Sequence, residues 1–270
     1  MRFESQLPPA LTIATVAELA ATPAWRTVDF ISDLHLTAGE PATFAAFQHY
    51  LETTPADAVF ILGDLFEVWV GDDAVNASQA ETSFEGRCAG ELRRAAKRLA
   101  LFFMHGNRDF LVGPAFLALC KASLLDDPTV FSFAGQRWLL SHGDALCLDD
   151  TDYMQFRQQV RSAAWQQAFL ARPLAERQAI ARDMRQQSEA RKRSGIDYGD
   201  VDAAAARQWL EAAKAHTLIH GHTHKPAEHD LGQGFSRVVL SDWDAQAGRP
   251  RADVLRLNAG GLQRIALLPF

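Results

Sequence analysis

Five short motifs in the chain carry carboxylate, amide and imidazole side chains, the groups that bind metal ions and transfer protons. They are DLH at 33–35, GD at 63–64, GNRD at 106–109, HGD at 142–144 and GHTH at 221–224. One such motif alone has an ordinary explanation, because Asp and Asn often cap helices and form turns. Structural turns alone, however, do not explain why all five motifs carry nitrogen or oxygen donors.

Each motif directly follows an apolar run that is typical of a buried strand. The runs are TVDFIS (27–32), AVFIL (58–62), LFFMH (101–105), RWLLS (137–141) and TLIH (217–220), and a sixth is RVVLS (237–241). Helical patterns at 42–54 and 81–100 separate the first three runs, so the order predicts an α/β fold. Ligands bind at the carboxyl ends of strands in such sheets, and we expect the motifs to meet there.

The donor set indicates the kind of metal site. Two Asp, one Asn and four His offer oxygen and nitrogen without a thiolate, which suits Mn, Fe or Zn in a two-metal site better than structural zinc. Asp64 has two oxygens with which to bridge two ions. Ions about 3.5–4 Å apart activate a shared water and hold phosphoryl oxygens during in-line attack.

The composition is that of an ordinary globular protein of 270 residues, 48% hydrophobic and 22% charged. A net charge of −6 argues against a general nucleic-acid binder. Cys88, Cys120 and Cys147 are odd in number and far apart, which indicates reduced thiols. No apolar run approaches the ~18 residues of a membrane-spanning helix, and the N-terminus matches a signal peptide poorly.

Residues 151–200 interrupt the alternation with a purely helical pattern. We expect an N-terminal extension at 1–26, a core at 27–150 and 201–270, and a helical insertion at 151–200 between the two core parts. Within the core, β-hairpins are expected at Ala134-Gly135 and around 258–261. The segment from Arg157 to Arg193 contains nine Arg or Lys residues but only three acidic residues. A solvated helical face is the default interpretation, but the one-sided charge favours an anionic ligand or a membrane surface. The apolar residues of the insertion either pack on the core or line a groove for acyl chains: Phe156, Val160, Trp165, Phe169, Leu170 and Met184.

Together, DLH, GDLFEVWVGDD, GNRDF, SHGD and HGHTH resemble the calcineurin-like metallophosphoesterase superfamily over about residues 27–270. More narrowly, they are similar to the branch that acts in the lipid A pathway of Gram-negative bacteria. The resemblance implies a four-layer αββα sandwich with a helical cap. It also implies that hydroxide bound to a pair of Mn²⁺ ions, or of other divalent ions, attacks the α-phosphate of UDP-2,3-diacylglucosamine, giving UMP and 2,3-diacylglucosamine 1-phosphate.

The same resemblance assigns roles to individual residues. The first metal takes Asp33, His35, Asp64 and His224, and the second takes Asp64, Asn107, His142 and His222. Catalytic roles fall on Asp64, Asn107, Arg108 and His142, and substrate contacts on Asn107, Arg108, Asp150, Ser188, Lys192 and His222. The stretch ARKRSG departs from the family pattern by a small deletion, so Arg191 and Arg193 remain alternatives to Lys192.

Arg108 bears on the reaction type. Most members of the superfamily carry a His at this position, which is thought to protonate an alkoxide leaving group. An arginine, with a pKa above ~12, cannot donate a proton usefully, whereas a phosphate leaving group with a pKa near ~6 needs only charge stabilisation. Arg108 therefore favours pyrophosphate cleavage over ester hydrolysis, although a turn pair with Asp109 is the plain structural alternative.

The resemblance also implies a protein bound peripherally to the cytoplasmic face of the inner membrane, with a UDP-linked diacylated glucosamine lipid as its substrate. We expect no nucleic acid and no obligate protein partner. Two alternatives stay open: a related enzyme that acts on a soluble nucleotide, and a metal-binding scaffold without catalysis, although no ligand is missing here. Of the other histidines, His105 and His220 are expected in the core, and His49, His216 and His229 on the surface.

Overall fold

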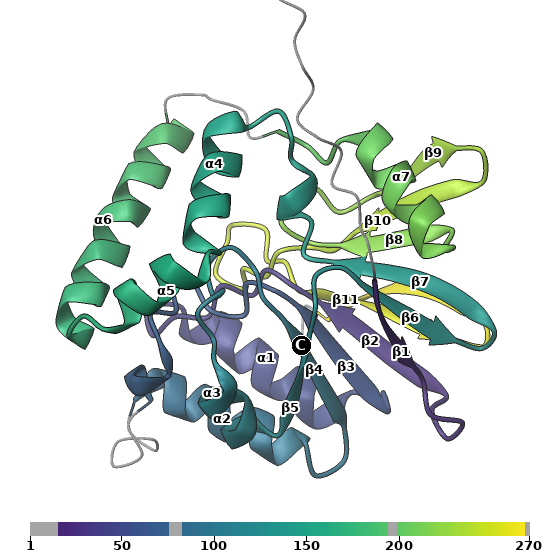
Figure 1. Ribbon diagram of the computed structural model, residues 1–270. Coiled ribbons are helices and arrows are strands. Elements are labelled where there is room, and N and C mark those ends of the chain that lie inside the picture. The colour runs from purple at the N-terminus through teal and green to yellow at the C-terminus, as the bar shows by residue number, and fades with distance from the viewer. Residues whose placement is uncertain (1–15, 76–82, 194–198, 268–270) are drawn as a thin grey trace, which may run out of the picture.

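The structure is a computed structural model that describes residues 16–75, 83–193 and 199–267, with the backbone alone at 187–193. Its centre consists of two six-stranded sheets that pack face to face (Figure 1). The first sheet has the order β12 (Gly261–Ala266), β11 (Asp253–Asn258), β2 (Thr27–Ile31), β3 (Ala58–Leu62), β4 (Ala100–Met104) and β5 (Ala122–Leu125). Strands β2 to β5 are parallel, so their carboxyl ends lie at one edge, while β11 runs antiparallel to β2.

The second sheet has the order β1 (Ala17–Ala20), β6 (Thr129–Phe133), β7 (Gln136–Ser141), β8 (Thr217–His220), β10 (Phe235–Val239) and β9 (Glu228–Gly232). Strands β7, β8 and β10 are parallel. Phe30 and Phe60 of the first sheet meet Phe131 of the second, and their rings lie 4.7–6.1 Å apart between centroids. These side chains are fully buried because the two sheets cover each other.

Helices cover both outer faces of the sandwich. The first sheet carries α1 (Pro41–Thr53), α2 (Phe84–Ala95) and α3 (Pro114–Cys120), and the second carries α7 (Ala203–Ala213). Each helix buries one face, as Phe44 and Phe47 do on α1 and Trp209 and Leu210 on α7. The expected four-layer sandwich is therefore confirmed.

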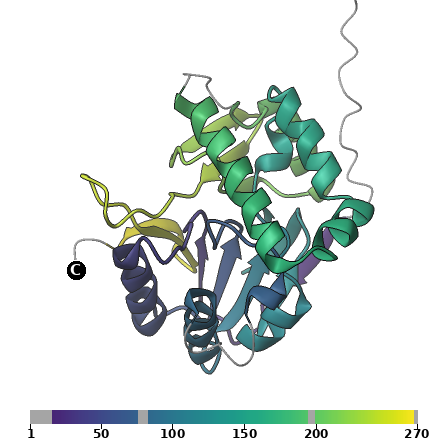
Figure 2. The same ribbon diagram turned by 90° about the vertical axis from the view of Figure 1, so that its left-hand side faces the viewer.

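Three helices stand apart from these layers. They are α4 (Thr151–Val160), α5 (Ala163–Leu170) and α6 (Leu174–Arg193), which lie together on one side of the molecule (Figures 1 and 2). Asp150 and Ser162 cap α4 and α5 by accepting bonds from the N–H groups of Tyr153 and Trp165. In the described part of 151–200 there is no strand.

Some elements differ from the expectation. Residues 17–20, within the expected extension, form β1, which pairs with β6, and Leu19 packs against the core between the sheets. Strands β5 and β9 were also not predicted; both lie at sheet edges, where their exposed residues weaken the apolar pattern. Both expected hairpins are present, at Ala134-Gly135 and between Asn258 and Gly261. The three cysteines are buried and free.

Candidate metal centre

The loops that follow β2, β3, β4, β7 and β8 bring the seven expected donors together. Five of these residues have positive φ angles of 48–67°: Asp33, His35, Asp64, His222 and His224. Such backbone conformations are uncommon outside glycine and persist only where the surroundings enforce them. The chain therefore leaves β2, β3 and β8 in tight left-handed steps that aim these side chains at a shared centre.

Two glycines allow this close approach. A Cβ atom at Gly106 would collide with the backbone and carboxylate of Asp64, and one at Gly221 would collide with Ser32 and Asp33. The motifs GNRD and GHTH thus begin with glycine because a neighbouring loop lies where a side chain would be.

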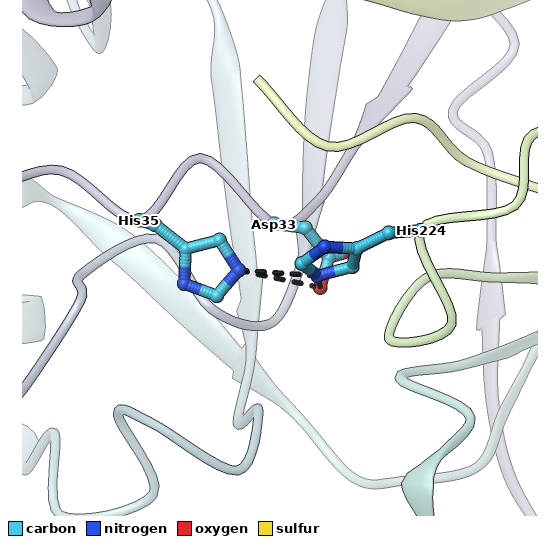
Figure 3. A group of neighbouring side chains, drawn as sticks. All are labelled: Asp33, His35 and His224. Atoms are coloured by element: carbon cyan, nitrogen blue, oxygen red, sulfur yellow. Dashed lines mark hydrogen bonds and ion pairs between the residues drawn. The ribbon is translucent and has the colours of Figure 1, made fainter. Parts of the chain in front are cut away.

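Asp33, His35 and His224 form what we term the first ligand group (Figure 3). The Nε2 atoms of His35 and His224 are 3.2 Å apart, and His224 Nε2 is 3.3 Å from Asp33 Oδ1. Asp33 is fully buried, and its other oxygen accepts bonds from the Ser32 hydroxyl and the His222 N–H. One carboxylate oxygen and two ring nitrogens therefore face a common point.

Core residues orient the histidines of the first ligand group. His35 Nδ1 is 2.9 Å from Glu67 Oε2, and His224 Nδ1 is 3.9 Å from Asp242 Oδ2. Glu67 lies within ion-pair distance of His35 Nδ1 on the side away from the site, whereas Asp242 is too distant from His224 for a hydrogen bond. Glu67 was not predicted as part of the site, although it lies within the motif GDLFEVWVGDD.

Asn107, His142 and His222 form the second ligand group. Asn107 Oδ1 lies 3.0 Å from His142 Nε2 and 2.9 Å from His222 Nδ1. His142 is fully buried, and its Nδ1 contacts the Leu62 carbonyl at 2.9 Å, which leaves Nε2 facing the site. An amide oxygen and two imidazole nitrogens converge here as they would around a cation.

Asp64 lies between the two groups. Its Oδ2 is 3.9 Å from His35 Nε2 and 3.8 Å from His142 Nε2, while its Oδ1 accepts the Arg108 N–H at 2.8 Å. Bridging by both oxygens was expected, but only Oδ2 faces both groups. Asp33 is also close enough to join Asp64 and His142 in a second metal-ligand cluster.

The protein environment shifts the pKa values of these donors strongly. Burial would raise the pKa of Asp33, but bonding and attraction from His224, with His142 and His35, hold it well below its ordinary value. Burial opposes protonation of His142, yet Asp64 and Asp33 raise its pKa to about 9. For His222, burial and the neighbouring His142 lower the pKa to about 3. A buried carboxylate that stays charged and an imidazole whose protonated form is favoured by nearby carboxylates mark a site that attracts positive charge, and its oxygen and nitrogen donors fit a pair of divalent cations.

Asp109 is a buried support for the backbone. It accepts bonds from the N–H groups of Leu65 at 2.7 Å and Gly106 at 2.9 Å, and from those of Asp64 and Phe66 at 3.2 and 3.4 Å. It thereby ties the loop after β3 to the loop after β4. The expected pairing with the Arg108 side chain is not among its contacts; that guanidinium lies 3.9 Å from Glu67 instead.

A cavity of about 650 Å³ opens from the metal centre toward the three separate helices. Its polar end includes His35, Asp64, Asn107, Arg108 and His222, and Asp150 also lines it. Its apolar wall includes Phe110, Phe156, Trp165, Phe169 and Met184. Val160 is instead buried, and Leu170 is 42% exposed. The side chains of Ser188 and Lys192, and of Arg191 and Arg193, lie outside the described residues.

The remaining histidines lie away from this centre. His220 is buried against the Gly221 carbonyl at 2.9 Å, and burial lowers its pKa to about 4. His105 contacts the Val112 carbonyl at 2.7 Å. His49 and His216 are exposed as expected, whereas His229 is half-buried.

Comparison with known proteins places this geometry in a family. The family model for the calcineurin-like phosphoesterase matches residues 26–226, which include every donor described above. The chain belongs to this family. The family and the donor set identify the chain as a metal-dependent hydrolase, a reaction for which carboxylate, amide and imidazole donors are suited.

Curated relatives extend the likeness over most of the chain. A UDP-2,3-diacylglucosamine hydrolase of Chromobacterium violaceum is 47% identical, over 89% of this chain and 98% of its own. One of Ralstonia nicotianae is 45% identical over 87% and 90%, and one of Pseudomonas aeruginosa is 42% identical over 80% and 91%. Among the residues that the structure describes, no helix has the length and apolar character needed to cross a bilayer.

Proposed function

We propose that this protein hydrolyses the pyrophosphate bond of UDP-2,3-diacylglucosamine to UMP and 2,3-diacylglucosamine 1-phosphate, a step of lipid A synthesis. The observation that carries the proposal is the single cavity that joins the metal centre and Arg108 to an apolar wall. Such a cavity suits a molecule with a pyrophosphate at one end and acyl chains at the other. The names of the relatives at 42–47% identity point to the same substrate.

The two ligand groups and Asp64 between them would hold two divalent cations, for which we propose Mn²⁺ because the donors mix carboxylate and amide oxygen with imidazole nitrogen. Bound there, the cations would activate the attacking water and offset the charge of the phosphates. The chain itself sets the geometry of the donors. Asp109 fixes the loops that carry Asp64 and Asn107, and Glu67 orients the ring of His35.

Arg108 would stabilise the leaving group. Water attacks the α-phosphorus and loses a proton to the surrounding solvent, the bond from this phosphorus to the bridging oxygen breaks, and the lipid phosphate departs with the electron pair. The Arg108 guanidinium lines the cavity beside Asn107 and can donate two parallel bonds to phosphate oxygens. Since the departing phosphate is a weak base, no proton donor is required at this position.

The apolar wall would hold the acyl chains. Trp165 and Phe169 stack with centroids 4.7 Å apart, and Phe110 lies 6.1 Å from Trp165. A soluble nucleotide would leave this surface wet, so the lipid is the better-fitting substrate. We propose accordingly that the protein works at the cytoplasmic face of the inner membrane as a peripheral protein, where such a lipid resides.

The test is an assay of the purified protein on detergent-dispersed UDP-2,3-diacylglucosamine, with UDP-N-acetylglucosamine in parallel. We expect release of UMP from the lipid, loss of activity with EDTA and recovery with Mn²⁺. Full activity after removal of divalent metal would refute the metal centre. A clear preference for the soluble compound would instead favour the related enzyme that acts on soluble nucleotides.

A further inference from the structure

One face of α4 touches all three loops that carry the second ligand group. Tyr153 and Arg157 of α4 and Arg161, its C-cap residue, are spaced by four residues, so their side chains project from the same side. The Tyr153 side chain approaches the loop after β8, and the Arg161 side chain approaches the loop after β4. Tyr153 and Arg157 also share a partner in the loop after β7.

The partner after β7 is Asp144, which lies two residues beyond His142 and is fully buried. Its Oδ2 accepts bonds from the Tyr153 hydroxyl at 2.7 Å and from Arg157 Nε at 2.8 Å, and Arg161 is 3.7 Å away. Two arginines of the insertion, Arg157 and Arg161, lie against this buried carboxylate and supply its counter-charge. A buried charged pair of this kind holds its two elements in one relative position.

The other two contacts reach the remaining ligands. The Tyr153 ring stacks on His222 with 5.9 Å between centroids and 28° between planes. Arg161 donates to the Gly106 carbonyl at 2.9 Å, directly before Asn107, and its guanidinium lies 5.4 Å from the centre of the Phe110 ring. Together with Asp144, these contacts brace the segments of Asn107, His142 and His222.

The first ligand group has different support. The contacts described for Asp33, His35 and His224 come from Ser32, Glu67, Asp242 and neighbouring loops of the core. The insertion is also fastened elsewhere, where the buried Arg177 of α6 pairs with Asp73 and donates to the Val70 carbonyl. That fastening provides a comparison, because it anchors the insertion to the far part of the loop after β3, and its described contacts include none of the loops that carry Asn107, His142 and His222.

We propose that α4 is a positioning element for the second ligand group alone, with Tyr153, Arg157 and Arg161 acting through Asp144, His222 and Gly106. The insertion then does more than cover the substrate, since it completes one of the two cation sites. This inference rests on the metal centre of the proposed function. It assigns the three residues to positioning rather than to catalysis.

The test variant is the double substitution Tyr153→Phe/Arg161→Met. It removes the hydroxyl bond to Asp144 and the bond to Gly106, but it retains the aromatic ring and leaves Arg157 to neutralise Asp144. The matched control is Arg177→Met, which removes a buried arginine of the insertion whose partners, Val70, Asp73 and Arg172, lie outside the three loops of the second ligand group. Circular dichroism and thermal unfolding establish that each variant is folded, and Tyr153→Phe alone serves if the double variant is not.

The measurement is a titration of metal-free protein with Mn²⁺, followed by electron paramagnetic resonance. We expect the wild-type protein and Arg177→Met to bind two ions and to show the signal of a spin-coupled pair. In the double variant, the weaker of the two sites should lose affinity about tenfold or more, so that the coupled signal fades while one ion remains bound.

Two results would overturn the inference while leaving the proposed function intact: unchanged binding of both ions in the double variant, or equal loss of the second ion in Arg177→Met. The first would mean that the second ligand group needs no brace. The second would mean that any loosening of the insertion has the same effect. A wild-type protein that binds no Mn²⁺ would instead refute the metal centre itself, and the inference with it.

Discussion

The two ligand groups are similar in composition but differ in what holds them. Asp33, His35 and His224 depend on the core, where Glu67 lies on one imidazole and the Trp243 N–H donates to the Asp33 carbonyl at 3.0 Å. Asn107, His142 and His222 are contacted in addition by a helix of the insertion. The insertion reaches the first ligand group only indirectly, through the pair of Arg185 of α6 with Glu67, whereas α4 contacts the segments of the second ligand group directly.

This division links the metal centre to substrate recognition. Tyr153 and Phe156 of α4 line the cavity, and Tyr153 also stacks on His222. A shift of α4 would therefore change the cavity wall and the second ligand group together. Substrate that packs against this helix would stabilise the arrangement in which both cations bind, since ligands favour the conformation that they contact best.

The largest effect is expected at the residue shared by the two groups. Asp64→Asn keeps an acceptor for the Arg108 N–H but removes the charge that faces both His35 and His142. Loss of several kcal/mol of cation stabilisation corresponds to a fall in kcat/KM on the order of 10³-fold. Calorimetric Mn²⁺ titration should show both sites weakened. Retention of either site at wild-type affinity would show that Asp64 serves one group only.

Arg108 should separate chemistry from metal binding. We expect Arg108→Ala to lower kcat about 10²–10³-fold with two Mn²⁺ ions still bound, because only its main chain contacts a ligand residue. Arg108→Lys should recover part of the loss, since it keeps the charge but not the two parallel donors. Steady-state kinetics with metal analysis on the same samples provide the measurement. A loss of bound metal in Arg108→Ala would assign the side chain to the metal centre instead.

A variant at Glu67 should weaken the first cation site, whereas the α4 variant should weaken the second. Glu67→Gln removes the carboxylate that orients His35 and should weaken the first site about tenfold. The second site should be unaffected, because none of the described contacts of Asn107, His142 or His222 involves Glu67. The Mn²⁺ titration used for α4 measures this directly. Equal weakening of both sites would contradict the separate support of the two groups.

Much of the centre could be predicted because its signal is local. Each donor directly follows a recognisable strand, and parallel strands deliver their carboxyl ends to one edge. Glu67 carries no such mark, since an acid within an apolar stretch identifies no partner. Most partners of Asp109 were also hidden: three of its four are backbone N–H groups of residues 64–66, more than 40 positions away.

The regular spacing of polar residues on α4 can be found in the sequence, but it has two interpretations. A spacing of four at Tyr153, Arg157 and Arg161 equally describes a solvated helical face. Only the packing of the helix against a buried Asp144 decides between these interpretations. Strand β1 was missed for a related reason: its residues alternate between half-buried and exposed at a sheet edge, so the apolar pattern of a core strand is absent.

The smallest effect is expected where the insertion returns to the core. Arg237 donates to both oxygens of Asp200 at 2.7 and 2.8 Å, and this bonding lowers the pKa of Asp200 to about 2. Because the folded-state pKa is depressed, the contribution to stability is complete above the ordinary pKa near 3.8 and disappears as the pH falls through about 2.

Asp200 is 41% exposed, so Asp200→Asn should reduce the free energy of unfolding by less than about 1 kcal/mol at pH 7. Urea unfolding at pH 7 and pH 3 should show this difference shrinking at the lower pH. Both Mn²⁺ sites should remain, because Arg237 and Asp200 contact none of the six residues in the two ligand groups. Loss of the second ion here would mean that fastening the insertion at its far end already positions the ligands, and that α4 has no special part in doing so.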